Sequence, residues 1–343
     1  MSKLCVVFCL IIFSVFLFLG LEVQAAPTVL NVATWGGHYK ESFEKSINYF
    51  EKENNAKVNF FIGDAAQMLV KARLGQVDVV VSAVNFSIDG ENEGLWAELD
   101  ETKIPNMADL YDIFKLSKYT VAKDFGDYII YYNDKYIKTP PTSWNDLWNS
   151  SYKNHVAIYA FLEESTMSLL LLQAQQNGGS VDNIKPGLDR LLELYKNGNL
   201  IGMVQGSAEM QNLFTLEEAW IGPLTNNRRK VFLDEKLDFI KTVRPKEGSF
   251  VFYSTVNVVK LTKELDLAMK FVNYTLDPIC QDVFMDNFYS PTVRDAKVVP
   301  PELKDILVPM ENVDKLFPSV DDCIKIVKNK ELWTKEWDEM IYK

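Results

Sequence analysis

The residue types that carry most enzymatic chemistry are scarce in this sequence of 343 residues. It has only two histidines, His38 and His155. It contains no G-x-S-x-G elbow, no H-E-x-x-H motif, no phosphate-binding loop and no G-x-G-x-x-G turn. Paired acids are common in a chain with 47 Asp and Glu residues, so they indicate acid–base catalysis only weakly. We therefore expect no catalytic residue and no enzyme, and a secreted hydrolase that uses a carboxylate pair is the alternative.

Aromatic side chains, by contrast, gather where predicted strands end. A ring at a strand end that faces a cleft can hold a ligand by its face, and each contact with a cation contributes about 0.5–2 kcal/mol. Packing in a hydrophobic core is the alternative for every such ring. Core packing is the least favoured interpretation for Trp35, because two glycines follow it and leave backbone N–H groups open at the head of a helix. The rings concerned are Trp35, Tyr39, Trp220, Phe252 and Tyr289.

Two acidic residues, Glu163 and Glu164, stand between a predicted strand and a predicted helix that begins at Ser165. A carboxylate at such a rim can pair with an ammonium group, which contributes roughly 1.5–3 kcal/mol per charge-assisted hydrogen bond. The alternative is that acids in the first turn only complement the helix dipole. The basic run at 228–230 is interpreted as a solvated loop.

Strands and helices alternate in two stretches of the chain, which meet near residue 135. A continuous β-branched run at 77–82 is typical of a parallel strand covered on both faces. Because the alternation runs twice, we expect two α/β lobes with a cleft between them. Ligands favour such domain interfaces and the carboxyl ends of parallel strands. The predicted strands are 29–34, 57–62, 77–82, 127–133, 156–160, 201–204, 218–221 and 249–259. The predicted helices include 67–74, 165–176, 187–197 and 261–274, followed by mixed short helices in the last 40 residues.

The composition favours a folded, acidic protein. The net charge is −11 and the pI is about 4.9, so the chain repels phosphate backbones and attracts cations. Nucleic acid is therefore not an expected partner. Aromatic residues make up 13% of the chain, which suits a protein that stacks on small molecules.

Residues 1–25 have the pattern of a secretory signal peptide, with Lys3, an uncharged run and small residues up to Ala25. We expect cleavage after Ala25. The alternative is an uncleaved anchor, although the apolar run is slightly shorter than the ~20 residues that span a bilayer. The mature chain keeps Cys280 and Cys323, which either form a disulfide after export or stay as two buried thiols. Neither lies near a histidine, so no metal site is expected.

Several segments, in order along residues 28–343, resemble the periplasmic solute-binding proteins of ABC importers, and specifically the spermidine/putrescine-binding group and its close relatives. The segment PPTSWNDLW at 140–148 is typical of the superfamily, whereas Trp35 and the segment PKEG at 245–248 indicate the polyamine-type branch. The other segments that carry the resemblance are 32–37, 57–60, 77–82, 93–96, 132–135 and 289–292.

The resemblance implies an α/β two-lobe periplasmic-binding-protein fold, with hinge strands and a ligand cleft between the lobes. It implies that residues 26–134 with 251–296 form lobe 1, and that 135–250 with 297–343 form lobe 2. The binding positions of the family, carried over residue by residue with their immediate neighbours, fall on Trp35, His38, Tyr39, Ser82, Asn85, Glu163, Glu164, Trp220, Phe252, Ser254 and Tyr289.

The implied function is a periplasmic receptor that binds a small cationic solute, such as putrescine or spermidine, and delivers it to a membrane permease. The receptor is expected to be a monomer without cofactor or metal. One position departs from the polyamine binders, because Ser254 stands where they carry an aspartate. Other ligands known for this fold are therefore alternatives, namely opines, amino-acid derivatives, thiamine and ferric ion.

Overall fold

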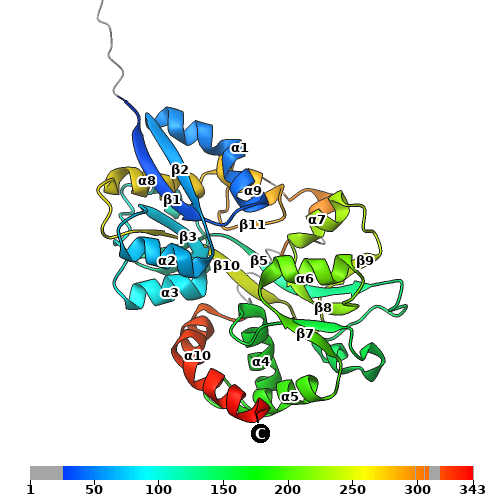
Figure 1. Ribbon diagram of the computed structural model, residues 1–343. Helices are drawn as coiled ribbons and strands as arrows, with labels where there is room; N and C mark the ends of the chain where they lie inside the picture. Colours follow the sequence, from blue (N-terminus) through cyan, green and yellow to red (C-terminus); the bar gives the residue numbers. More distant parts are fainter. Residues whose placement is uncertain (1–25, 298, 305, 309–316, 343) are drawn as a thin grey trace, which may run out of the picture.

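One continuous sheet joins two α/β lobes in the computed structural model, which describes residues 26–297, 299–304, 306–308 and 317–342 (Figure 1). The main path of the sheet is β2-β1-β3-β10-β5-β8-β6-β7, and β4, β9 and β11 also pair with β5. The predicted α/β class and the predicted pair of lobes are confirmed. The signal peptide predicted at 1–25 lies outside the described residues.

The first lobe is built on parallel strands whose successive residues face opposite sides of the sheet. On β3, Val79 and Val81 pack into the core formed with α1, α8 and α9, whereas Val80 packs toward α2. This explains the continuous apolar run of β3, which is covered on both faces. The elements are β1 (Thr28–Thr34), α1 (His38–Glu53), β2 (Ala56–Ile62), α2 (Ala65–Arg73), β3 (Val79–Ala83), α3 (Val84–Asn92), α8 (Leu265–Thr275) and α9 (Pro278–Met285).

The second lobe repeats this arrangement around a separate hydrophobic core. Strand β6 pairs in parallel with both β7 and β8, and the leucine-rich helix α4 is buried along most of its length. The elements are β6 (Val156–Tyr159), α4 (Glu164–Gln176), α5 (Lys185–Lys196), β7 (Leu200–Val204), α6 (Gly206–Thr215), β8 (Ile221–Thr225), α7 (Arg228–Asp234) and β9 (Ile240–Val243).

Two long antiparallel strands, β5 (Thr120–Asn133) and β10 (Phe250–Val258), run from one lobe into the other (Figure 1). On β5, Phe125 belongs to the first core and Tyr128 to the second. On β10, the change falls between Val251 and Phe250. These strands have the position expected of a hinge, and the predicted division of the chain into lobes stays a proposal. Short elements complete the described chain: β4 (Lys115–Ser117), β11 (Ser290–Pro291) and 3₁₀ turns at Pro105–Ala108, Asp112–Phe114, Trp144–Trp148, Ser150–Tyr152 and Pro301–Leu303.

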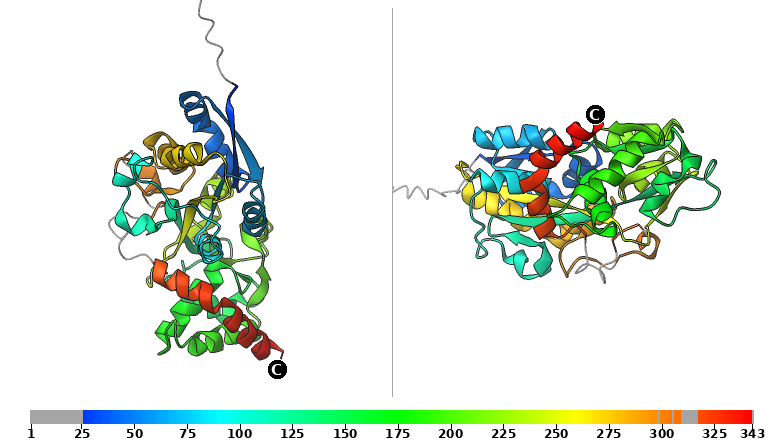
Figure 2. Two further views of the ribbon diagram at one scale, coloured as in Figure 1. Left: turned by 90° about the vertical axis from the view of Figure 1, so that its left-hand side faces the viewer. Right: turned by 90° about the horizontal axis from the view of Figure 1, so that it is seen from below.

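The C-terminal segment forms one 22-residue helix, α10 (Val320–Ile341), so the prediction of mixed short helices there was wrong. The helix lies across both lobes (Figure 2). Cys323 near its start packs into the first core, whereas Trp333 and Trp337 pack into the second. Its apolar side is therefore divided between two cores, which leaves a weak periodic signal in the sequence.

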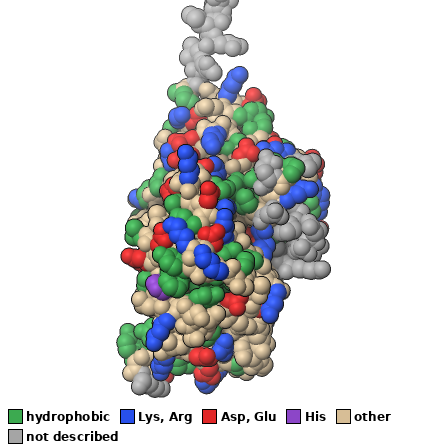
Figure 3. All heavy atoms as spheres, turned by 90° about the vertical axis from the view of Figure 1, so that its right-hand side faces the viewer, with side chains coloured by type: hydrophobic (Ala, Val, Ile, Leu, Met, Phe, Trp, Pro, Cys, Tyr) green, Lys and Arg blue, Asp and Glu red, His purple; other side chains and the backbone are tan. Residues whose placement is uncertain are grey.

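One face of the molecule shows charge of both signs without segregation. On the face shown in Figure 3, acidic and basic side chains are interspersed among apolar and neutral ones. Among the residues that the structure describes, no helix combines the length and the apolar character needed to cross a membrane.

Candidate ligand-binding site

A cavity of about 830 Å³ opens where the two lobes face each other, and residues of both lobes line it. Trp35 and Tyr39 come from the first lobe, and Tyr128, Glu163 and Glu164 come from the second. The volume is in the range of small-molecule sites. Of the eleven predicted binding residues, the nine that line this cavity are Trp35, His38, Tyr39, Asn85, Glu163, Glu164, Phe252, Ser254 and Tyr289.

Several helices begin at the cavity wall. The lining includes the starts of α1, α3, α4 and α6, and none of these four helices has a side-chain cap on its free backbone N–H groups. At α1 the cap position is Gly37, with a φ of 58° and open space where a Cβ would stand. The chain needs glycine there because other residues rarely adopt this backbone conformation. The helix starts give the wall a positive partial charge.

Aromatic rings form much of the first-lobe wall. Trp35 meets Tyr39 edge to face, with ring centroids 4.9 Å apart, and Tyr39 meets Tyr289 in the same way at 5.2 Å. Across the hinge, Phe252 packs edge to face on Tyr128 at 5.7 Å. Trp35 is partly exposed, whereas Tyr39 and Tyr289 are buried. The rings thus brace one another around Trp35, which is free to contact a ligand.

A buried ion pair supports Tyr39 from behind. The Tyr39 hydroxyl donates to Asp124 Oδ2 at 2.9 Å, and Lys123 Nζ lies 2.5 Å from the same oxygen. A β-bulge in the pairing of β5 with β10 makes room for Lys123, whose ammonium group lies 3.1 Å from the ring centroid of Phe284. Burial, together with the charge of Asp124, raises the pKa of Tyr39 well above its usual value. Tyr39 is therefore a neutral, fixed hydroxyl at the floor of the cavity.

The two acids of the second lobe, Glu163 and Glu164, occupy the N-cap and the first position of α4. Neither forms an ion pair with any residue in the described part of the chain, and Glu164 Oε1 is buried without a hydrogen-bond partner. Burial raises the pKa of Glu163. Burial and the neighbouring Glu163 raise the pKa of Glu164 to about 8, so Glu164 is mostly protonated at neutral pH in the empty cavity.

Two predicted binding residues do not line the cavity. Ser82 is fully buried in β3, where its carbonyl accepts a hydrogen bond from Thr255. Trp220 stacks between His155 and Tyr136, at centroid distances of 3.7 and 4.5 Å. It immediately precedes β8, whose five residues carry the chain about 17 Å at ~3.3 Å per residue before it reaches the cavity. The sequence pattern instead predicts this strand at 218–221, which would place Trp220 near its carboxyl end, beside the cavity. The observed strand starts after Trp220.

Because the range of β8 was predicted incorrectly, other residues that line the cavity were not predicted. The run at 228–230, predicted to be a solvated loop, instead begins α7, and Arg228 and Lys230 both face the cavity. Thr225 and Asn227 at the end of β8 line it as well. A strand placed correctly at 221–225 would have pointed to them, because polar residues after a strand end are frequent ligand contacts.

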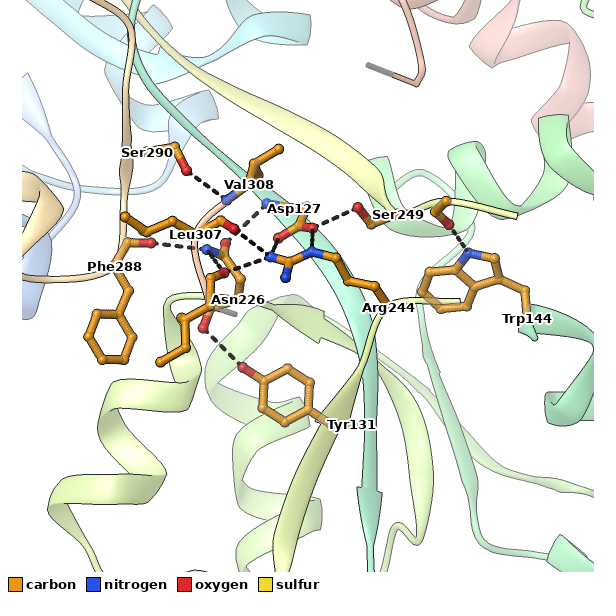
Figure 4. Close-up of polar contacts among 12 residues, drawn as sticks. Asp127, Tyr131, Trp144, Asn226, Arg244, Ser249, Phe288, Ser290, Leu307 and Val308 are labelled. Atoms are coloured by element: carbon orange, nitrogen blue, oxygen red, sulfur yellow. Dashed lines mark hydrogen bonds and ion pairs between the residues drawn. The ribbon is translucent and has the colours of Figure 1, made fainter. Parts of the chain in front are cut away.

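A polar cluster near the crossing strands connects the lobes (Figure 4). Asp127 on β5 accepts from Arg244 Nε at 2.8 Å and from the Ser249 hydroxyl at 2.6 Å, and its backbone N–H donates to the side chain of Asn226 at 3.0 Å. Arg244 also donates to the carbonyl of Leu307 at 3.0 Å. Asp127 is almost fully buried, so this cluster fixes the backbone at the hinge and does not contact the cavity.

Cys280 in α9 and Cys323 in α10 are separate, buried free thiols. Of the two arrangements open from the sequence, the structure has the one without a disulfide. In the described residues, no cluster of three or more His, Cys, Asp or Glu side chains could hold a metal ion.

Comparison with known proteins agrees with this architecture. Residues 76–316 match the family model described as bacterial extracellular solute-binding protein. The chain is 26% identical over 268 residues to the spermidine/putrescine-binding periplasmic protein 1 of Haemophilus influenzae, which covers 74% of this chain and 71% of that protein. Its fold is similar to a spermidine/putrescine substrate-binding protein of Streptococcus pneumoniae, with a TM-score of 0.69, 21% identity and coverage of 92% and 98%.

It is also similar to a solved GABA receptor, with a TM-score of 0.74, 20% identity and coverage of 91% of this chain and 97% of that one. The curated relatives are named as periplasmic binding proteins, and the Streptococcus pneumoniae protein is the substrate-binding protein of an ABC transporter. The matched model covers well over half of the sequence. The chain therefore belongs to the bacterial extracellular solute-binding proteins, the receptor components of ABC importers.

Proposed function

We propose that this receptor captures a small solute with an ammonium group in the cavity between its lobes and delivers it, as a monomer, to a membrane permease. Residues 1–25 direct its export to the periplasm and are then removed. The observation that carries the proposal is the pair Glu163 and Glu164, two acids without ion-pair partners among the described residues, which face a cavity walled by aromatic rings.

The acidic side chains and the aromatic side chains of the cavity favour an amine in different ways. Glu163 supplies charge to the ammonium group, and a charge-assisted bond shielded from water contributes about 1.5–3 kcal/mol. Trp35 and Phe252 offer ring faces and edges to the alkyl part, with cation–π attraction where the amine lies over a ring. Because these residues come from both lobes, a ligand that contacts them all stabilises the closed arrangement.

The names of the relatives support an amine. Spermidine, putrescine and GABA all carry at least one amino group. The polyamine class predicted from the sequence stays one candidate, although Ser254 replaces the aspartate of that class. A carboxylate beside this position is Asp124, which pairs with Ser254 across the strands but is already bound by Lys123 and Tyr39.

The test is isothermal titration calorimetry with a panel of diamines, polyamines, amino acids and amine-free analogues. The Glu163→Gln variant should bind amines about tenfold more weakly and amine-free analogues unchanged. Glu218→Gln is the matched control, because Glu218 is exposed and lies outside the cavity. Equal weakening of amines and amine-free analogues by Glu163→Gln would refute the proposal. Product formation from any bound compound would favour the hydrolase alternative.

A further inference from the structure

Arg228 introduces a positive charge into the same cavity as the two acids. In the described chain it forms no ion pair, and its Nη1 makes only a long hydrogen bond of 3.4 Å to Gln211. Its Nε is buried without any partner. Removing a guanidinium donor from water without a hydrogen bond is costly, so the site favours an acceptor brought by a ligand.

The other charges of the cavity wall are already engaged. Lys230 binds Asp234 on its own helix at 2.9 Å, Asp64 caps the start of α2, and His38 contacts Glu41 at 3.0 Å. The ionisable groups of the wall that remain without an ion-pair partner in the described residues are Arg228, Glu163 and Glu164.

The charges of the cavity wall favour one class of amine ligand over another. The wall offers one acidic place for an ammonium group, at Glu163 and Glu164, and one cation without an ion-pair partner, Arg228. A diamine or triamine would add two or three positive charges and place one of them near Arg228, where like charges repel. A ligand with one ammonium and one acidic group adds no net charge and can pair both free groups.

The unpartnered atoms of the wall show the same complementarity. Acceptor oxygens of Asn85, Glu164 and Asn227 are buried without partners, as is the donor Nε of Arg228. The first group suits a ligand that donates, as an ammonium does, and Arg228 suits one that accepts. Gly206 and Ser207, at the uncapped start of the ten-residue helix α6, also line the cavity and add donors suited to an anion.

From these contacts we propose that the solute is an amino acid in the broad sense, with a carboxylate or phosphonate that binds Arg228 and an ammonium that binds at Glu163 and Glu164. This inference rests on the proposed function, since it adds an acidic group to the amine already assigned. Arg228 acts as the residue that selects amino acids over polyamines.

The test compares ligands of equal chain length by calorimetry: 4-aminobutyrate, 3-aminopropylphosphonate, putrescine, 1-aminobutane and butyrate, with the shorter and longer members of each series. At the best length, the amino acid should bind at least tenfold more tightly than the diamine or the monoamine. Arg228→Gln should weaken the amino acid about 10- to 100-fold and the monoamine little, and Arg228→Lys should restore part of the loss. The carboxylate and phosphonate members show which acidic group is preferred.

Arg229→Gln is the matched control. It removes the same charge one residue away, but Arg229 points out of the cavity to the carbonyl of Ile240. Diamines binding as tightly as amino acids, or equal losses for both classes in Arg228→Gln, would overturn the inference and leave the amine receptor intact. Butyrate binding as tightly as 4-aminobutyrate would instead overturn the proposed ammonium site. A panel in which no amine binds overturns both.

Discussion

The raised pKa of Glu164 predicts that ligand affinity depends on pH between 6 and 8.5. Glu164 begins α4 at the cavity wall, and burial followed by the charge of Glu163 raises its pKa to about 8 in the empty cavity. An ammonium beside it stabilises the carboxylate, so the pKa is lower in the complex and binding releases a proton. Affinity must then rise with pH up to the pKa of the free protein and level off above it.

The size of the effect follows from the fraction of Glu164 that is ionised before binding. With a pKa of about 8, roughly 1% is ionised at pH 6 and roughly half at pH 8, so affinity should rise about 50-fold over this interval. An amino acid such as 4-aminobutyrate keeps its own charges throughout the range, so the change reports on the protein.

The assay is calorimetry at pH 6, 7, 8 and 8.5, in buffers that differ in ionisation enthalpy, so that proton release is measured directly. Release should approach one proton at pH 6 to 7. Glu164→Gln should bind with nearly constant affinity, and His38→Asn separates any contribution of the histidine at the rim. Equal wild-type affinity at pH 6 and pH 8, or the same pH dependence in Glu164→Gln, would refute the reasoning.

Four further predictions concern stability and binding. Without ligand, the folded-state pKa of Glu164 lies above its unfolded value, so the melting temperature should fall as pH rises from about 5 to 8, and Glu164→Gln should lessen that fall in thermal scans. Trp35→Ala should lower ligand affinity at least tenfold, or about 1.4 kcal/mol, with an unchanged circular dichroism spectrum; wild-type affinity would remove Trp35 from the site. Lys123→Met leaves the buried Asp124 unpaired and should cost about 3–5 kcal/mol in urea unfolding, whereas Lys123→Met combined with Asp124→Asn should recover much of it. Asp127→Asn should lower the free energy of unfolding by about 1–3 kcal/mol through its lost arginine contact, and a smaller change would show that the hinge cluster contributes little.

The regular elements were predictable where their signal is local. The apolar run of β3 and the one-sided apolar pattern of α5 follow from strand and helix periods, and the structure has these elements close to the predicted ranges. Two elements were misread for tertiary reasons. Helix α10 divides its apolar side between two cores, and β8, with Gly222 and Pro223 in its middle, lacks the usual strand composition.

The site was predictable where it is built from residues at the ends of strands. Trp35 with its glycines, and Glu163 with Glu164, stand at strand-to-helix junctions, and the carboxyl ends of strands in such folds face the ligand. Trp220 and Arg228 lie at opposite ends of β8, and the same rule would have placed both had the strand been located at 221–225. The glycine and proline within β8 hide it in the sequence, and its place in the sheet depends on antiparallel pairing with β5, a contact between residues far apart in the chain.

The amino-acid sequence alone determined the fold class, the absence of recognisable catalytic motifs and nine of the residues that line the cavity, since each of these depends on composition or on order along a few residues. The tertiary structure decided the charge state of the wall. It buried Glu164 beside Glu163, bound Asp124 with Lys123, and brought Arg228 to the cavity without a charged partner among the described residues. The free energy of a charge depends on burial and on its neighbours in space, and neither is written in the order of residues.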